Sequence, residues 1–225
     1  MKKLILVISF FFFLILPKQA WAHQPRIVSQ EKLQVENPEV SQAFYGELKG
    51  KPVSFEINST KPFILYLNLL VPDLPGIEKD VSARVYSGEE EIFFLDGTNF
   101  NWVSFFEEFA GDNYFKGPEI EEEVEQGKYL VEVFSSDNQG KYVLAIGKKE
   151  EFPPGETVET IFLLPQLKKN FFNKSPFTAF FNLIGLFLLI PLLILFAIVL
   201  IAFFLIRKIK RKKRTEKEKI KRALS

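Results

Sequence analysis

The chain has 225 residues, a formal net charge of +1, 47% hydrophobic residues and no cysteine. The absence of cysteine excludes disulfides, thiolate metal sites and cysteine-based catalysis. The charge is unevenly divided, because the last 19 residues carry +9 and the first 22 carry +3, which leaves −11 for residues 23–206.

Residues 1–22 have the layout of a secretory signal peptide. A basic start is followed by an apolar stretch at residues 4–16 and by Ala20-Trp21-Ala22, whose small residues suit a cleavage site. We expect cleavage before His23. An uncleaved signal anchor is the alternative, and in that case the domain that follows residue 22 would still face outward.

Residues 41–149 are predicted to form an extracytoplasmic β-sandwich, preceded by an N-terminal extension at residues 23–40. Short runs of alternating apolar and polar residues are separated by glycine-, proline- and asparagine-containing turns. This spacing favours an all-β fold, an antiparallel β-sandwich or jelly roll of eight or nine strands. The expected strands cover residues 44–48, 53–57, 63–70, 81–86, 91–95, 102–109, 129–134 and 142–146. The aromatic residues of 102–109 also fit a helical spacing, and we favour a strand there.

Two late segments carry a resemblance to a known family. Gly127-Lys128-Tyr129-Leu130 is followed, after a polar turn, by Gly140-Lys141-Tyr142-Val143-Leu144, and residues 43–48 and 53–57 form an earlier pair of strands. In this pattern residues 40–147 resemble the bacterial pre-peptidase C-terminal β-sandwich domains. The resemblance implies a non-catalytic accessory domain and no specific ligand. Members often carry acidic residues before the third strand, where this chain has Lys61 and Pro62, so a calcium role is not implied there.

A juxtamembrane connector is expected at residues 150–178, where aromatic and basic residues are mixed and Pro165 ends a short apolar run. Such a composition is typical of a segment at the lipid interface. Packing against the sandwich is the alternative, and the sequence does not separate the two.

Residues 179–206 are predicted to form a transmembrane helix. The 28 residues contain no charge, and as a helix they would span about 42 Å, more than the ~30 Å hydrocarbon core of a bilayer. A basic cytoplasmic tail at residues 207–225 follows. Lysine and arginine remain on the cytoplasmic side, so we expect a single-pass plasma-membrane protein with its N-terminal domain outside.

The basic residues next to the span are the predicted membrane-surface contacts, because lysine and arginine attract anionic headgroups. A nucleic-acid role is not favoured, since the tail is held at the membrane and lacks interleaved aromatic residues. The contact residues are Arg207, Lys208, Lys210, Arg211, Lys212, Lys213 and Arg214.

No catalytic, cofactor or metal site is predicted. His23 could hold copper at a mature N-terminus, but it is the one histidine in the chain, and such a site needs several converging ligands. The acidic residues at 89–91, 107–108, 112, 119, 121–123 and 125 lack the form of a calcium loop, and we interpret them as solvated faces. Exposed aromatic residues could bind sugars, and the candidates are Trp102, Tyr114, Phe115 and Tyr129.

The sequence therefore favours a non-enzymatic, membrane-anchored β-sandwich that binds a protein or cell-envelope partner. A carbohydrate- or calcium-binding surface module is the alternative. A glycan hydrolase using two carboxylates is a weaker third hypothesis, because the sequence does not single out any pair of acids. The sequence does not predict an oligomeric state.

Overall fold

A computed structural model describes residues 23–223, with the exception of residues 109 and 152. The predicted signal peptide, residues 1–22, lies outside the described residues. The chain divides into two compact units, Met1–Ala179 and Phe180–Ser225.

Unit 1 is a β-sandwich of two mixed sheets, with eleven strands in its described part. The six-stranded sheet has the order β1-β3-β11-β5-β9-β8, and the five-stranded sheet has the order β2-β4-β10-β6-β7. The all-β sandwich predicted from the sequence is therefore confirmed. The strands are β1 (Gln24–Ile27), β2 (Lys32–Val35), β3 (Gln42–Lys49), β4 (Val53–Ser59), β5 (Phe63–Pro72), β6 (Ser82–Ser87), β7 (Glu90–Leu95), β8 (Val103–Glu107), β9 (Asp112–Val124), β10 (Gly127–Phe134) and β11 (Gln139–Ile146).

The alternating apolar residues that the sequence shows face inward, and their packing holds the two sheets together. Inward-facing residues such as Phe55, Leu67, Val131 and Leu144 have no measurable exposure. Burying each apolar side chain of this size stabilises the fold by about 1.5–3 kcal/mol. The strand prediction at 102–109 is also confirmed, because β8 pairs antiparallel with β9.

The segment before residue 41 supplies one strand to each sheet. β1 pairs parallel with β3, and β2 pairs parallel with β4. Both strands have four residues, lie at sheet edges and have one hydrogen-bonded neighbour. Edge strands this short do not show a clear alternation, which explains why the sequence indicated an extension there and an all-antiparallel fold.

The 13-residue strand β9 was not expected either. Its pairing with β5 shifts register between Asn68 and Leu70. Phe115 faces the core before the shift, whereas Ile120 and Val124 face it afterwards. The bulge thus changes the parity of the inward positions, so no single period-two pattern runs through β9.

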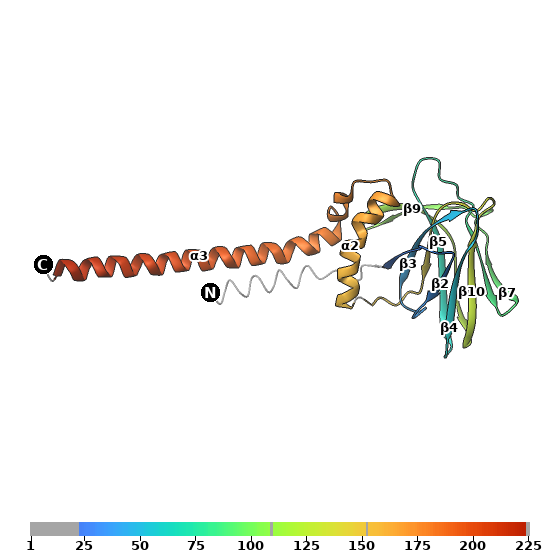
Figure 1. The fold of residues 1–225 in the computed structure, drawn as a ribbon, viewed down its shortest axis with the longest axis horizontal. Helices are drawn as coiled ribbons and strands as arrows, with labels where there is room; N and C mark the ends of the chain where they lie inside the picture. The colour runs from blue at the N-terminus through green and yellow to red at the C-terminus, as the bar shows by residue number, and fades with distance from the viewer. Residues whose placement is uncertain (1–22, 109, 152, 224–225) are drawn as a thin grey trace. The chain divides into compact units, whose positions relative to one another are not determined.

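The segment after the sandwich forms helix α2 (Pro154–Asn170), which lies on the outer side of the six-stranded sheet (Figure 1). Leu167, Phe171 and Phe172 pack on that side with Tyr45 and Tyr114. The rings of Tyr45 and Phe171 lie 5.1 Å apart, edge to face, and such pairs add about 0.5–1.5 kcal/mol beyond area burial.

Pro165 lies inside α2 rather than ending an apolar run. A proline inside a helix costs about 3 kcal/mol or more, because one backbone hydrogen bond is lost. The contacts of Leu164 and Leu167, both buried on the sheet side, offset that cost.

Unit 2 consists mainly of the long helix α3 (Leu183–Ala223), which follows the 3₁₀ helix η1 (Pro176–Phe180). The candidate membrane span within α3, Leu192–Arg214, has a mean hydropathy of 2.7, and none of it is buried in the structure. One apolar helix at the C-terminus, as the sequence predicted, is therefore confirmed among the described residues.

The buried Tyr142 hydroxyl gives the first prediction. Among the described residues its oxygen has no hydrogen-bond partner, and the ring packs against Gly46, where a Cβ would come within 2.4 Å of Tyr142 Cζ. We expect Tyr142→Phe to keep or raise the free energy of unfolding, since an unpaired buried polar group costs about 1–3 kcal/mol. Chemical denaturation of the detergent-solubilised chain measures this.

Tyr129→Phe is the matched control. The Tyr129 hydroxyl donates to the carbonyl oxygen of Glu125 at 2.7 Å, so its removal should cost about 1 kcal/mol. If Tyr142→Phe lowered the free energy of unfolding as much as Tyr129→Phe does, the description of the Tyr142 hydroxyl as unpaired would be wrong.

Candidate functional site

Helix α2 is attached to the sandwich by a buried ion pair. Lys168 Nζ lies 2.7 Å from Asp112 Oδ2 and donates to the carbonyl oxygen of Ala110 at 2.6 Å. Both charged side chains are 1% exposed. Lys174 Nζ reaches Asp112 Oδ1 at 3.0 Å from the segment that follows the helix. The start of β9 thus binds both α2 and the chain leaving it.

Sequence reasoning missed this pair. Asp112 and Lys168 are 56 residues apart, and each was read as part of an ordinary charged or interfacial run. One feature of the sequence could have indicated the buried pair. Lys168 falls on the same helical stripe as Leu164 and Phe171, which are four and three residues away. A lysine on an otherwise apolar, buried stripe indicates a buried partner.

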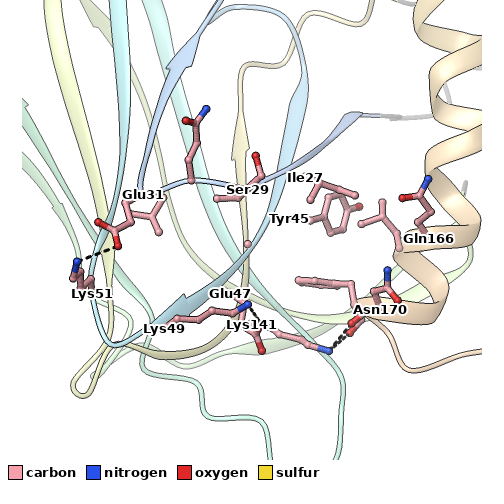
Figure 2. A pocket seen from close by; sticks show the side chains of 16 residues that line it. Ile27, Ser29, Glu31, Tyr45, Glu47, Lys49, Lys51, Lys141, Gln166 and Asn170 are labelled. Atoms are coloured by element: carbon pink, nitrogen blue, oxygen red, sulfur yellow. Dashed lines mark hydrogen bonds and ion pairs between the residues drawn. The ribbon is translucent and has the colours of Figure 1, made fainter.

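A cavity of about 320 Å³ lies between α2 and the chain that crosses from β1 to β2. Figure 2 shows its wall of Ile27 and Tyr45 and its polar rim. On the helix side it is bounded by Gln166, Leu167, Asn170 and Phe171, and on the other by Val28, Ser29, Gln30 and Glu31 together with Lys49 and Lys51.

The charged groups at the cavity already have partners. Lys141 Nζ donates to the carbonyl oxygens of Asn170 and Phe171 at 3.0 and 2.8 Å, and thereby caps the C-terminus of α2. Lys51 pairs with Glu31 at 3.2 Å. The cavity is therefore amphipathic, and its lysines serve structural contacts rather than a concentrated anion site.

A different surface lies on the outer face of the five-stranded sheet, away from α2. The rings of Phe94 and Phe134 are nearly parallel, at 5° and 6.4 Å between centroids. The Arg84 guanidinium lies 5.5 Å from the first ring and 4.8 Å from the second. We call these three residues the aromatic platform. It combines apolar faces with a cation on a surface open to solvent.

The predicted membrane-contact residues all lie on the C-terminal half of α3 and are exposed. The structure places Arg207, Lys208, Lys210, Arg211, Lys212, Lys213 and Arg214 within one continuous helix. Continuous basic residues on an exposed helix present their charge in every direction around the axis.

The other sequence candidates are placed less favourably for binding. Tyr114 and Tyr129 are buried, and Trp102 and Phe115 pack against the main core, so these four do not form an exposed sugar surface. Within the described residues no group of three or more histidine, cysteine, aspartate or glutamate side chains could hold a metal ion.

His23 is partly buried in unit 1 and contacts the side chain of Ser41. Its Nδ1 lies 2.5 Å from Ser41 Oγ. Burial lowers the pKa of His23 to about 4, so the folded protein favours the neutral ring.

Comparisons with solved structures give weak matches, two of which are described here. The chain is similar to the pre-peptidase C-terminal domain of a collagenase from Bacillus anthracis, at 12% identity and a TM-score of 0.32, with 56% of this chain and 95% of that one covered. A β-glucosidase from Paenibacillus barengoltzii matches at 9% identity and a TM-score of 0.25, over 56% of this chain and 13% of that chain.

The first match is a weak one to a domain of the family that the sequence resembles. At these TM-scores neither match assigns a function. No family model matches the chain, and no curated protein sequence matches it significantly.

The buried pair gives a prediction for stability. Lys168→Met leaves Asp112 with Lys174 alone and should cost about 3 kcal/mol, the scale for breaking a buried ion pair. Lys49→Met removes a surface pair with Glu47 at 3.1 Å and should cost less than about 1 kcal/mol. Denaturant unfolding of both variants measures the difference, and equal losses would contradict the role assigned to Lys168.

The lowered pKa of His23 gives a pH dependence. The unfolded chain binds a proton near pH 6.5 that the folded chain does not take up until about pH 4, so this contribution to stability falls as the pH falls through that window. We expect His23 to account for a loss of about 1 kcal/mol between pH 7 and 5.5. The measurement is the difference between unfolding curves of wild type and His23→Gln, and identical pH slopes would refute it.

Proposed function

We propose that this protein is a non-enzymatic, membrane-anchored β-sandwich module that faces outward and binds a protein or cell-envelope partner. The observation that carries the proposal is the exposed apolar part of α3, which follows a well-packed sandwich, α2 and η1 in the chain. A long apolar helix with no buried surface is unstable in water and is suited to a bilayer.

The length and flanks of α3 support a single crossing. Leu183–Ile206 is uncharged and spans about 36 Å, enough for a hydrocarbon core of ~30 Å with some tilt. The basic run that follows favours the cytoplasmic side for the C-terminus. A cleaved signal peptide at residues 1–22 would deliver the sandwich to the outside of the plasma membrane.

The seven basic residues from Arg207 to Arg214 contact anionic lipid headgroups in this proposal. Each lysine or arginine close to such a surface contributes about 1 kcal/mol. Because α3 continues through them as a helix, all seven follow the uncharged segment within a few helical turns, where their long side chains reach the headgroups.

The aromatic platform is the partner surface that we favour. It lies on the sandwich face that α2 does not cover, and Phe94 is 48% exposed. Aromatic and arginine side chains are enriched among residues that dominate binding energy. Nothing in this arrangement resembles a nucleophile with its base, which agrees with a binding role.

A carbohydrate partner is the second candidate, and the parallel rings of Phe94 and Phe134 are the observation that favours it. Flat apolar ring faces on an open sheet can stack on sugar rings, and Arg84 can donate hydrogen bonds to hydroxyl or carboxylate oxygens. The calcium alternative gains no such support from the described residues.

Orientation is tested with single cysteines, because the natural chain has none. We expect a membrane-impermeant maleimide to label Glu89→Cys, in the exposed turn before β7, on intact cells. Ser225→Cys in the tail should be labelled after permeabilisation and not before. The reverse pattern would contradict the outward orientation.

The aromatic platform is tested by its removal. Phe94→Ala with Phe134→Ala should weaken binding of the membrane-reconstituted chain to its partner at least tenfold, about 1.4 kcal/mol. Ile64→Ala, which removes an exposed apolar side chain on the six-stranded sheet, is the control and should leave binding unchanged.

Two further measurements distinguish a protein partner from a carbohydrate partner. A photoreactive residue at position 94 that gives one discrete protein adduct in native membranes supports a protein partner. Retention on isolated envelope glycan that the double variant loses supports carbohydrate. The absence of both signals would contradict the assignment of the aromatic platform as the partner surface.

A further inference from the structure

Exposed apolar side chains gather on one side of unit 1. Of the nine large exposed hydrophobic residues described before Pro176, six lie on the side that carries α2. Side chains alternate along a strand, so each is placed by its cross-strand neighbour. Phe105, for example, is opposite Tyr114, which packs under α2. The six are Ile27, Ile64, Val103, Phe105, Val158 and Phe162.

The buried side of α2 fixes which residues of the helix point outward. Leu164, Leu167 and Lys168 face the sheet, so Val158 and Phe162, on the opposite stripe, face solvent. Phe162 is 70% exposed. The helix cannot turn this ring inward without withdrawing Lys168 from Asp112, so its exposure is imposed by the fold.

The chain leaves unit 1 close to this side. Phe105 lies 6.5 Å from the ring of Tyr114, which in turn lies 5.4 Å from Phe172, just after α2. Phe177 in η1 is 75% exposed. Unit 1 ends at Ala179 and α3 begins at Leu183, a separation that an extended chain spans in about 14 Å at most.

We propose that the side of unit 1 that carries α2 rests on the outer surface of the bilayer, with Phe162 and Phe177 at the boundary between headgroups and acyl chains. The contact surface consists of Val103, Phe105, Val158, Phe162 and Phe177. The inference rests on the proposed function, because it requires α3 to span the membrane. The occupant is then the lipid surface, which chain connectivity brings within a few residues of η1.

The composition of the surface fits a lipid interface. Aromatic rings favour the headgroup level of a bilayer, and the exposed Lys169 on α2 can reach lipid phosphates. Ile64 lies outside the contact surface, because its strand neighbours include Glu121 and Glu123, which anionic lipid would repel. With this side held down, the aromatic platform on the opposite sheet points away from the membrane.

The test uses the full chain with single cysteines carrying a bimane fluorophore. Phe162→Cys and Phe177→Cys report on the proposed surface, and Phe94→Cys is the matched control, an exposed phenylalanine on the other sheet. Each is placed at one chain per lipid nanodisc, so that a second copy cannot cover the surface. Quenching by spin-labelled lipid reports contact with the bilayer, and quenching by iodide reports contact with water.

We expect spin-labelled lipid to quench positions 162 and 177 several-fold more than position 94, and iodide to show the reverse order. Equal quenching at 162 and 94 would overturn the proposal. Shielding of 162 that appears only when several chains share a bilayer would also overturn it, in favour of a second copy. Val158→Cys repeats the measurement if Phe162→Cys lowers the unfolding temperature.

The membrane span of the proposed function is checked separately, with the same variants in liposomes. Retention of the chain in liposomes after an alkaline wash shows an integral membrane protein whatever the quenching result. Loss of the chain in that wash would contradict the span itself.

Discussion

The attachment of α2 to the sandwich through Lys168 and Asp112 is the constraint on which the other features depend. Two fully buried charges are stable only when they are paired and hydrogen-bonded. Here the lysine has a carboxylate and a backbone carbonyl, and the carboxylate has a second lysine, Lys174. The pair therefore sets the rotation of the helix and the direction in which the chain leaves it.

This attachment gives the sandwich two unlike outer faces. One carries α2, with Phe162 turned outward and the exit toward α3 nearby. The other is an open sheet with Phe94, Phe134 and Arg84. In the proposed arrangement on the bilayer, this second face is left open to the surroundings. In the proposed function, the seven basic residues toward the end of α3 contact anionic lipid headgroups.

The sequence was sufficient for features that depend on local pattern. Period-two alternation identified strands such as β4 and β10, and an uncharged run followed by Arg207 identified the apolar helix. It was insufficient where long-range contacts decide the outcome. β1 and β2 are too short to show a period, the bulge at Asn68 interrupts the pattern of β9, and Lys168 has a partner 56 residues away. The aromatic platform was also missed, because Phe94, Phe134 and Arg84 come from three strands.

Amide hydrogen exchange of the full chain in nanodiscs tests most directly whether α2 is part of the sandwich. Exchange reports the free energy of local opening at each segment. Our account predicts that the amides of Leu164–Asn170 exchange as slowly as those of the central strand β11. Exchange of α2 within seconds, while β11 stays protected, would contradict it and leave the helix as a loose linker.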